Sequence, residues 1–177
     1  MKRALVLTWE KFQDHEVIYP YYSLKENGFE VTLAANQTGK IFGILGAHVN
    51  CDIATTDLYN ETVDDYDVLV IPGGVKALEK LRLDSSAIGF VQRWMETGKM
   101  VFVVCNGPQL LISAKALEGR RISGYYAIEQ DIINAGAEYS PDPVVVDGNI
   151  VSCPHYDFMG EWLRAGYEEF DKRQALG

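Results

Sequence analysis

Cys105 is the residue whose place in the sequence best suits it for chemistry. It ends an apolar run and is followed at once by Asn106, Gly107 and Pro108. A strand that turns sharply into a helix holds such a side chain up at the sheet edge, the geometry of a nucleophile elbow. The positive end of the helix would lower the pKa of the thiol and raise its thiolate fraction. We predict a reactive thiol; the alternative is an inert cysteine buried in a strand.

Two turns in the sequence offer backbone N–H donors to a substrate oxygen beside this thiol. Pro72-Gly73-Gly74 follows the apolar run that begins at Asp67, and glycine lets a backbone approach a ligand closely. The backbone N–H of Asn106 is a second donor, because the residue after a nucleophile commonly helps to bind an oxyanion. We therefore predict that Gly74 and Asn106 bind the oxyanion.

A third segment, from Asn149 to His155, ends another apolar run and carries both a thiol and an imidazole. Strand ends meet at one edge of an open α/β sheet, so we hypothesise that His155 faces the Cys105 pocket as a base or substrate donor. The alternative is a surface-loop histidine without a partner. Cys153 has two further interpretations, a resolving thiol for Cys105 or a metal ligand. Cys105 lies much farther in sequence from Cys153 and His155 than the ligands of a zinc site usually lie from one another. We expect no metal ion and no cofactor.

The composition limits the class of protein that carries these residues. The chain has 177 residues, 47% hydrophobic and 23% charged, which fits one soluble globular domain over 1–177. Its 16 Lys and Arg against 25 Asp and Glu give a net charge of −9. Nucleic acids and anionic membranes are bound by clustered positive charge, so neither is an expected partner. Three cysteines do not make a disulfide framework, which favours the cytoplasm.

Alternating strand and helix patterns must position these turns. Buried parallel strands are predicted at Ala4 to Thr8, Glu30 to Ala34, Asp67 to Ile71 and Met100 to Cys105. Helices are predicted from Glu16 to Asn27 with a kink at Pro20, from a Ser85-Ser86 cap to Gly98, from Pro108 to Leu117, from Ile128 to Gly136 and from Phe158 onward. The first strand is too short an apolar run to be a signal peptide.

Two stretches interrupt this alternation. Lys40 to Val49 is rich in glycine and β-formers and predicts a short hairpin or arm. Pro143 to Ser152 carries Asp147-Gly148 between two apolar runs, a strong hairpin signal. Strand–helix alternation with a late hairpin predicts an α/β fold, a three-layer α/β/α sandwich with a mainly parallel sheet.

The chain as a whole resembles the ThiJ/PfpI family, and in particular its PfpI-like branch. The resemblance rests on the order and spacing of Glu16-Val-Ile-Tyr-Pro-Tyr, Val-Ile-Pro72-Gly73-Gly74, Glu79-Lys-Leu-Arg82, Cys105-Asn-Gly-Pro-Gln-Leu-Leu-Ile-Ser-Ala, Leu117-Glu-Gly-Arg, Asn134-Ala-Gly-Ala and Val144-Val-Val-Asp-Gly-Asn. It implies a flavodoxin-like sandwich with a cysteine at a strained nucleophile elbow.

The resemblance also implies roles for individual residues. It makes Cys105 the nucleophile and Glu16 a buried acid that hydrogen-bonds the sulfur; the alternative for Glu16 is a first-turn glutamate that interacts with the helix dipole. Glu79 matches an acid that reaches a neighbouring subunit's site, although its spacing from Gly74 departs from the family pattern. Tyr125 matches a tyrosine over the pocket. The alternatives are a solvated helix glutamate and a core aromatic residue.

The chain departs from the branch directly after the cysteine. It has Cys105-Asn106-Gly107-Pro108 where the branch usually has Cys-His-Gly-Pro. Asparagine takes up no proton near neutral pH, which argues against proteolysis and against the histidine base of the branch.

The implied activity is that of a cysteine-dependent enzyme acting on small reactive carbonyl compounds, of the glyoxalase or deglycase type, through the Cys105 thiolate. The alternative is a redox-sensing or stress-response protein with an oxidisable Cys105 and little catalysis. The resemblance further implies a homodimer or a hexamer, with contacts through the Lys40–Val49 arm and the Glu79 region.

Overall fold

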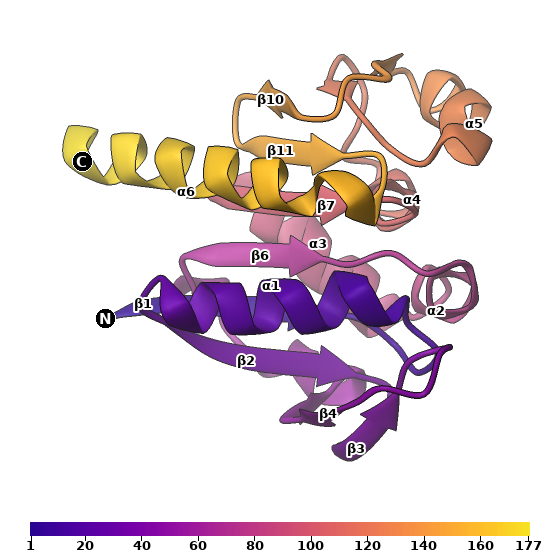
Figure 1. The fold of residues 1–177 in the computed structure, drawn as a ribbon, viewed down its shortest axis with the longest axis vertical. Helices are drawn as coiled ribbons and strands as arrows, with labels where there is room; N and C mark the ends of the chain where they lie inside the picture. Colours follow the sequence, from indigo (N-terminus) through magenta and orange to yellow (C-terminus); the bar gives the residue numbers. More distant parts are fainter.

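The centre of the molecule is a seven-stranded sheet, seen in a computed structural model that describes residues 1–177 (Figure 1). Its strands, in spatial order, are β10 (Val145–Asp147), β11 (Ile150–Cys153), β7 (Met100–Val104), β6 (Val68–Ile71), β1 (Lys2–Leu7), β2 (Phe29–Ala35) and β5 (Ile53–Ala54). All neighbouring strands are parallel except β10 and β11. This confirms the mainly parallel sheet predicted from the sequence.

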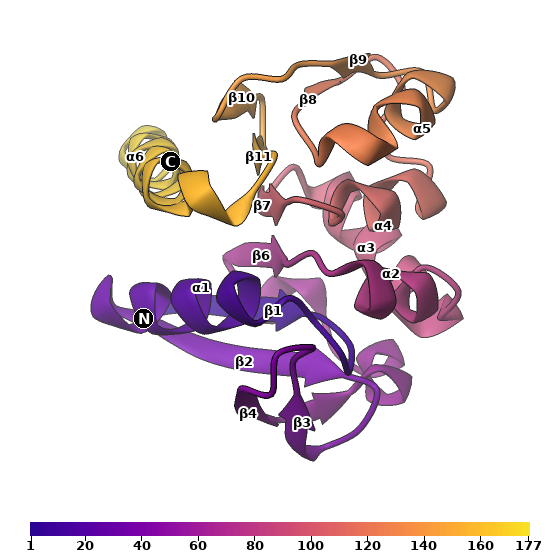
Figure 2. The same ribbon diagram turned by 45° about the vertical axis from the view of Figure 1, so that its right-hand side comes forward.

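Helices cover both faces of the sheet. They are α1 (Asp14–Glu26), α2 (Val75–Leu81), α3 (Ser85–Thr97), α4 (Pro108–Ser113), α5 (Glu129–Asn134) and α6 (Met159–Leu176). The long helices α1 and α6 lie on one face, and α3 and α4 lie behind the sheet (Figures 1 and 2). The predicted three-layer flavodoxin-like sandwich is thereby confirmed. None of the helices combines the length and the apolar character that a membrane crossing requires.

The central strands form because their sequences are apolar on both faces. Every residue of β6 and β7 is buried, as expected for parallel strands covered on two sides. Ile71 pairs with Val103 in the register of these two strands. The turns that follow them, Gly73-Gly74 and Cys105-Asn106, therefore leave the sheet at the same edge.

Several predicted boundaries differ from the observed ones for local reasons. Asp84, not the serine pair, caps α3, and its carboxylate accepts a hydrogen bond from the N–H of Ala87 at 2.8 Å. Pro20 lies within the second turn of α1 and does not end the helix. Helix α4 ends at Ser113, before the predicted Leu117. The helix predicted from Ile128 is the short α5, which follows a turn of 3₁₀ helix.

Two small sheets flank the main one. One of them is the predicted arm, the hairpin of β3 (Gly39–Phe42) and β4 (His48–Cys51). The predicted late hairpin is β10 and β11, which belongs to the main sheet. Strands β8 (Arg121–Ile122) and β9 (Glu138–Tyr139) pair in parallel over α5. Each has only two residues and no period-2 pattern, so the sequence did not predict them.

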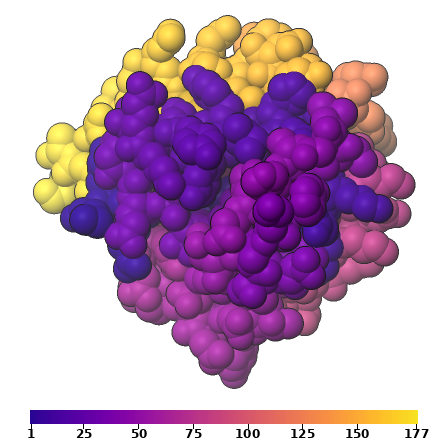
Figure 3. Space-filling view, turned by 60° about the horizontal axis from the view of Figure 1, so that its bottom comes forward, coloured from indigo at the N-terminus to yellow at the C-terminus, as the bar shows by residue number.

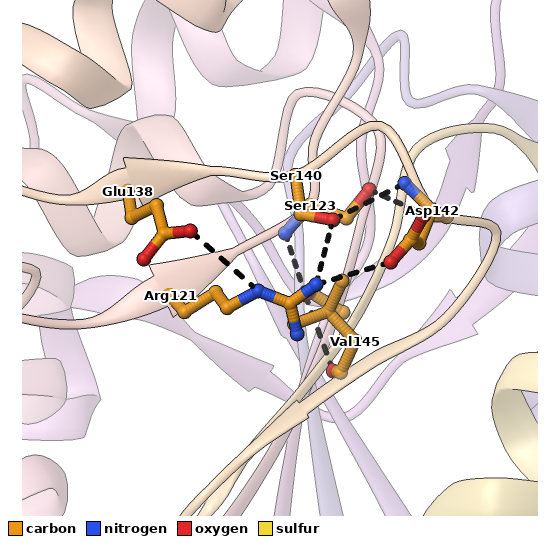
Figure 4. A network of polar contacts seen from close by, with 7 residues as sticks. Arg121, Ser123, Glu138, Ser140, Asp142 and Val145 are labelled. Atoms are coloured by element: carbon orange, nitrogen blue, oxygen red, sulfur yellow. Dashed lines mark hydrogen bonds and ion pairs between the residues drawn. The ribbon is translucent and has the colours of Figure 1, made fainter.

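A polar network ties β8 and the segment after it to the late hairpin (Figure 4). Arg121 donates to Ser140 at 3.2 Å and to Asp142 at 3.0 Å. The Ser123 N–H donates to the buried Ser152 hydroxyl at 2.9 Å, and the Ser123 hydroxyl donates to the Asp142 carbonyl at 3.1 Å. These bonds fix the backbone immediately before Tyr125.

Candidate active site

Cys105 sits at a strained elbow between β7 and α4. Its φ is +59°, in the left-handed region that costs a residue with a Cβ about 1–2 kcal/mol. Two backbone hydrogen bonds hold it there: its N–H donates to the carbonyl of Cys153 at 2.9 Å, and its carbonyl accepts from the N–H of Tyr125 at 2.8 Å. A non-glycine residue kept in this conformation points to a functional constraint.

The Gly107 that follows is required by the tight packing under the elbow. A Cβ at this position would lie 2.6 Å from the carbonyl oxygen of Ile71 and 2.7 Å from the Val103 side chain. The Cys-Asn-Gly sequence is thus the local cause of the turn, because only glycine lets the α4 backbone pass so close to β6.

Glu16 projects from the first turn of α1 to this elbow and is fully buried. Its Oε1 accepts a hydrogen bond from the N–H of Gly73 at 2.9 Å. Its other oxygen, Oε2, is buried without a hydrogen-bond partner, and the Cys105 thiol is close enough to affect the carboxyl pKa. A buried acid with a free oxygen beside a thiol is available to exchange a proton with it.

Gly73 makes room for this arrangement, and sequence reasoning missed it by choosing Gly74 alone. A Cβ on Gly73 would clash with Glu16 Oε1 and would lie 2.9 Å from both the Asn106 nitrogen and Cys105 Cβ. The Gly73-Gly74 pair was the sequence signal that could have identified Gly73. Gly74 itself has φ +109° and is the N-cap residue of α2.

Neither of the two backbone donors predicted for an oxyanion is taken up by an oxygen of the chain. The N–H of Gly74 and that of Asn106 donate to no oxygen of the protein. The Asn106 N–H is directed at Cys105, where it favours the thiolate. Backbone N–H groups with no internal acceptor at a nucleophile are suited to bind a substrate oxygen.

Burial controls the ionisation of the Glu16–Cys105 pair. It raises the pKa of Glu16 to about 7, against the smaller opposing effects of Cys105 and the Gly73 N–H. Burial also raises the pKa of the Cys105 thiol, and the negative charge of Glu16 raises it further. The lowering expected from the end of the six-residue α4 does not prevail. Because Glu16 has the lower pKa of the two, it loses its proton before the thiol does, and its carboxylate then opposes a thiolate beside it.

A row of aromatic rings extends from His15 to Tyr126 and reaches the neighbourhood of Cys105 at Tyr125. His15 stacks on Tyr156 with ring centroids 4.1 Å apart, and Tyr156 lies 4.0 Å from the ring of His155. His155 lies in turn 6.5 Å from Tyr125, which contacts Tyr126 at 4.4 Å. Tyr125 is half-buried and lies in the segment that hydrogen-bonds the Cys105 backbone. Tyr156 was missed from the sequence because a single tyrosine in a loop carries no pattern.

Three other predicted residues lie as follows. Nδ1 of His155 accepts from the N–H of Asp157 at 3.2 Å and lies 3.3 Å from its carboxylate, and no hydrogen bond joins the ring to Cys105. Cys153 is fully buried, its thiol is free, and its S–H donates to the carbonyl of His155 at 3.0 Å. Glu79 is exposed on α2, and its side chain makes no hydrogen bond or ion pair within the chain.

Comparison with known proteins places this site in a family. The DJ-1/PfpI family model matches residues 2–169. The chain is 43% identical over 162 residues to "Deglycase PfpI" of Pyrococcus furiosus, covering 92% of this chain and 95% of that one. It is 41% identical over 154 residues to "General stress protein 18" of Bacillus subtilis, covering 86% of this chain and 83% of that one.

A solved structure agrees with these sequence relatives. It is a two-domain protein from Anabaena variabilis with DJ-1/ThiJ/PfpI-like and ferritin-like domains, and it superposes with a TM-score of 0.91 at 34% identity. The match covers 97% of this chain and 48% of that one. The elbow cysteine, the buried glutamate and the Gly-Gly turn thus occur in a chain that belongs to the DJ-1/PfpI family.

Proposed function

We propose that this protein is a cysteine-dependent enzyme of the deglycase or glyoxalase type, which acts on small reactive carbonyl compounds in the cytoplasm. The observation that carries the proposal is the strained Cys105 beside the fully buried Glu16, whose free oxygen Oε2 has no other partner. The names of the relatives support a deglycase-type activity. We propose no proteolysis, because Asn106 supplies no imidazole base.

In the proposed reaction, Glu16 transfers the proton of the Cys105 thiol to the substrate. Cys105 sulfur forms a bond to the aldehyde carbon of a 2-oxoaldehyde, and the thiol proton passes through Glu16 to the aldehyde oxygen, giving a hemithioacetal. The Gly74 and Asn106 N–H groups bind that oxygen as its negative charge develops. Glu16 then moves the proton of this carbon to the adjacent carbonyl carbon by way of an enediol. The hydroxyl proton passes to the former carbonyl oxygen, which leaves the thioester of a 2-hydroxy acid. Water cleaves the thioester to a 2-hydroxy acid and restores the thiol.

The remaining candidate residues take supporting roles in this proposal. Tyr125 covers the pocket and contacts the substrate. His155 binds a substrate oxygen at the rim rather than acting on the sulfur, since its Nδ1 is engaged by Asp157. Glu79 acts at the site of a neighbouring subunit in a homodimer or hexamer.

The decisive experiment is methylglyoxal consumption and lactate formation by the purified protein. We expect Cys105→Ser to lose at least about 100-fold in kcat/KM, as is common when a nucleophile is removed. The matched control is Cys51→Ser, because Cys51 is buried away from the site and donates to the carbonyl of Ile53 at 3.2 Å. Equal activity of the wild type and Cys105→Ser would overturn the proposal.

The second candidate is a redox-sensing stress protein, favoured by the stress-protein relative and by a buried thiol without a neighbouring imidazole. Such a protein would leave methylglyoxal unchanged in the same assay. Mild peroxide would then add two oxygen atoms selectively to Cys105, a change that peptide mass spectrometry detects.

A further inference from the structure

The side chain of Asn106 contacts the sulfur of Cys105. It is 4% exposed, and its Oδ1 accepts a hydrogen bond from the Cys105 thiol at 3.4 Å. Glu16 is the other side chain that interacts with this thiol. The residue that stands in the place of the branch's histidine is therefore a direct partner of the reacting atom.

The other end of the same amide is free. Asn106 Nδ2 donates to no atom of the protein, yet it is not one of the buried polar atoms sealed from solvent without a partner. Nδ2 is therefore not sealed from solvent, and its two N–H groups have no partner within the chain. A primary amide beside a nucleophile with both donors unused is placed to bind an oxygen or an anion.

An amide suits both forms of the sulfur without holding a proton itself. Its oxygen accepts from the S–H of the neutral thiol, and a half-turn about its last side-chain bond presents an N–H to the thiolate. Hydrogen bonds to an ionised acceptor are roughly twice as strong as those between neutral groups. The half-turn therefore stabilises the thiolate without adding a charge.

We propose that the side-chain amide of Asn106 is the positioning residue of Cys105, holding the thiol through Oδ1 and donating through Nδ2 to the thiolate or to the bound substrate oxygen. This inference rests on the proposed function for its substrate, although not for its effect on the sulfur. It leaves Glu16 as the group at the sulfur that titrates near neutral pH.

The other titratable groups around the sulfur do not alter that conclusion. They come from two further elements, Cys153 at the end of β11 and Tyr125 after β8. Burial raises the pKa of Cys153 to about 12, and the Tyr126 hydrogen bond raises that of Tyr125. Both stay neutral between pH 5 and 9. The ring of His155 is hydrogen-bonded to Asp157 and not to the sulfur.

The test is the rate of Cys105 alkylation by iodoacetamide between pH 5 and 9, followed at the Cys105 peptide by mass spectrometry. For the wild type we expect a single inflection. Asn106→Asp has the same shape but no donor, and its carboxylate opposes the thiolate, so we expect alkylation at pH 8 to slow at least 10-fold. Asn106→His should retain alkylation and add a second inflection near pH 6–7, where imidazole titrates.

Asn106→Ala is a second variant, used in case the buried aspartate of Asn106→Asp prevents folding, and thermal unfolding is recorded for each variant. Asn106→Ala should slow alkylation several-fold at every pH without a new inflection. A purely structural side chain would change the unfolding temperature and leave the pH profile unaltered. Wild-type rates and profiles in both Asn106→Asp and Asn106→Ala would overturn the inference. Since alkylation needs no substrate, a protein inactive on methylglyoxal would refute the proposed function and leave this result standing.

Discussion

At the scale of single residues, Glu16 is where burial and hydrogen bonding compete most directly. Its carboxyl is fully buried, and one N–H from Gly73 is its only well-aligned donor. One hydrogen bond does not replace the water that a carboxylate loses on burial. Burial therefore prevails and raises the pKa to about 7. The acid keeps its proton up to neutral pH, which is what a proton donor to the Cys105 site requires.

This raised pKa makes folding depend on pH in a defined direction. The folded state binds the Glu16 proton more tightly than the unfolded chain does, so the free energy of unfolding falls as pH rises from about 4.5 to about 7. We expect the ionisation of Glu16 to lower the free energy of unfolding by roughly 3 kcal/mol between these two pH values. In Glu16→Gln, which cannot ionise, this contribution should vanish.

Urea unfolding of the wild type and Glu16→Gln at pH 5 and pH 8 measures the effect. From pH 5 to pH 8, the free energy of unfolding of the wild type should fall relative to that of Glu16→Gln. A difference between the two proteins that is the same at pH 5 and pH 8 would show that Glu16 is ionised in the folded state.

At the scale of elements, apolar runs and glycines made most of the fold predictable. The β7 strand and the Asp147-Gly148 hairpin are determined by local sequence, since burial on both faces and a φ of +57° at Gly148 each demand particular residue types. The contact of Glu16 with Gly73 was not predictable. These residues are 57 positions apart, and only the packing of α1 against the sheet brings them together. The family resemblance supplied the role of Glu16 that residue patterns left open.

The packing of α6 on the sheet provides a test at this scale. Gly166 lies over the ring of Phe102, where a Cβ would be 2.8 Å from the nearest ring carbon. Alanine favours a helix over glycine by about 1 kcal/mol, whereas overpacking a core costs about 1–3 kcal/mol. Because Phe102 is fully buried and has little room to move, we expect Gly166→Ala to lower the free energy of unfolding.

Gly160 in the same helix is the matched control for that substitution. The nearest atom to a Cβ there is the Tyr19 hydroxyl at 4.0 Å, so Gly160→Ala should be neutral or stabilising by up to about 1 kcal/mol. Urea unfolding of both variants separates packing from helix propensity. If Gly166→Ala is as stable as Gly160→Ala, the ring contact does not constrain α6.

At the scale of the whole molecule, apolar side chains gather where the arm meets α1. The β3–β4 turn exposes Phe42, Ile44 and Leu45, with Leu45 69% exposed. Figure 3 shows the N-terminal third of the chain, which contains α1 and this arm, in indigo and purple across one face. The turn is held rigidly, because the Asp14 carboxylate accepts from the N–H of Leu45 at 2.8 Å and from that of Ala47 at 2.7 Å.

A rigid turn that presents large apolar side chains to water is typical of an interface. Such a turn loses little conformational entropy on association, and its apolar area can be buried against a partner. We therefore expect the protein to be a homodimer or hexamer in solution, and Leu45→Glu to weaken self-association at least 10-fold, because a buried carboxylate would lose its water without a partner. Analytical ultracentrifugation over a range of concentrations measures this. Leu176→Glu, at the exposed end of α6, adds the same charge away from the arm and should leave the assembly unchanged. A monomeric wild type, or an equal effect of the two substitutions, would exclude the arm as the interface and with it a role for Glu79 at a neighbouring Cys105 reached through that contact.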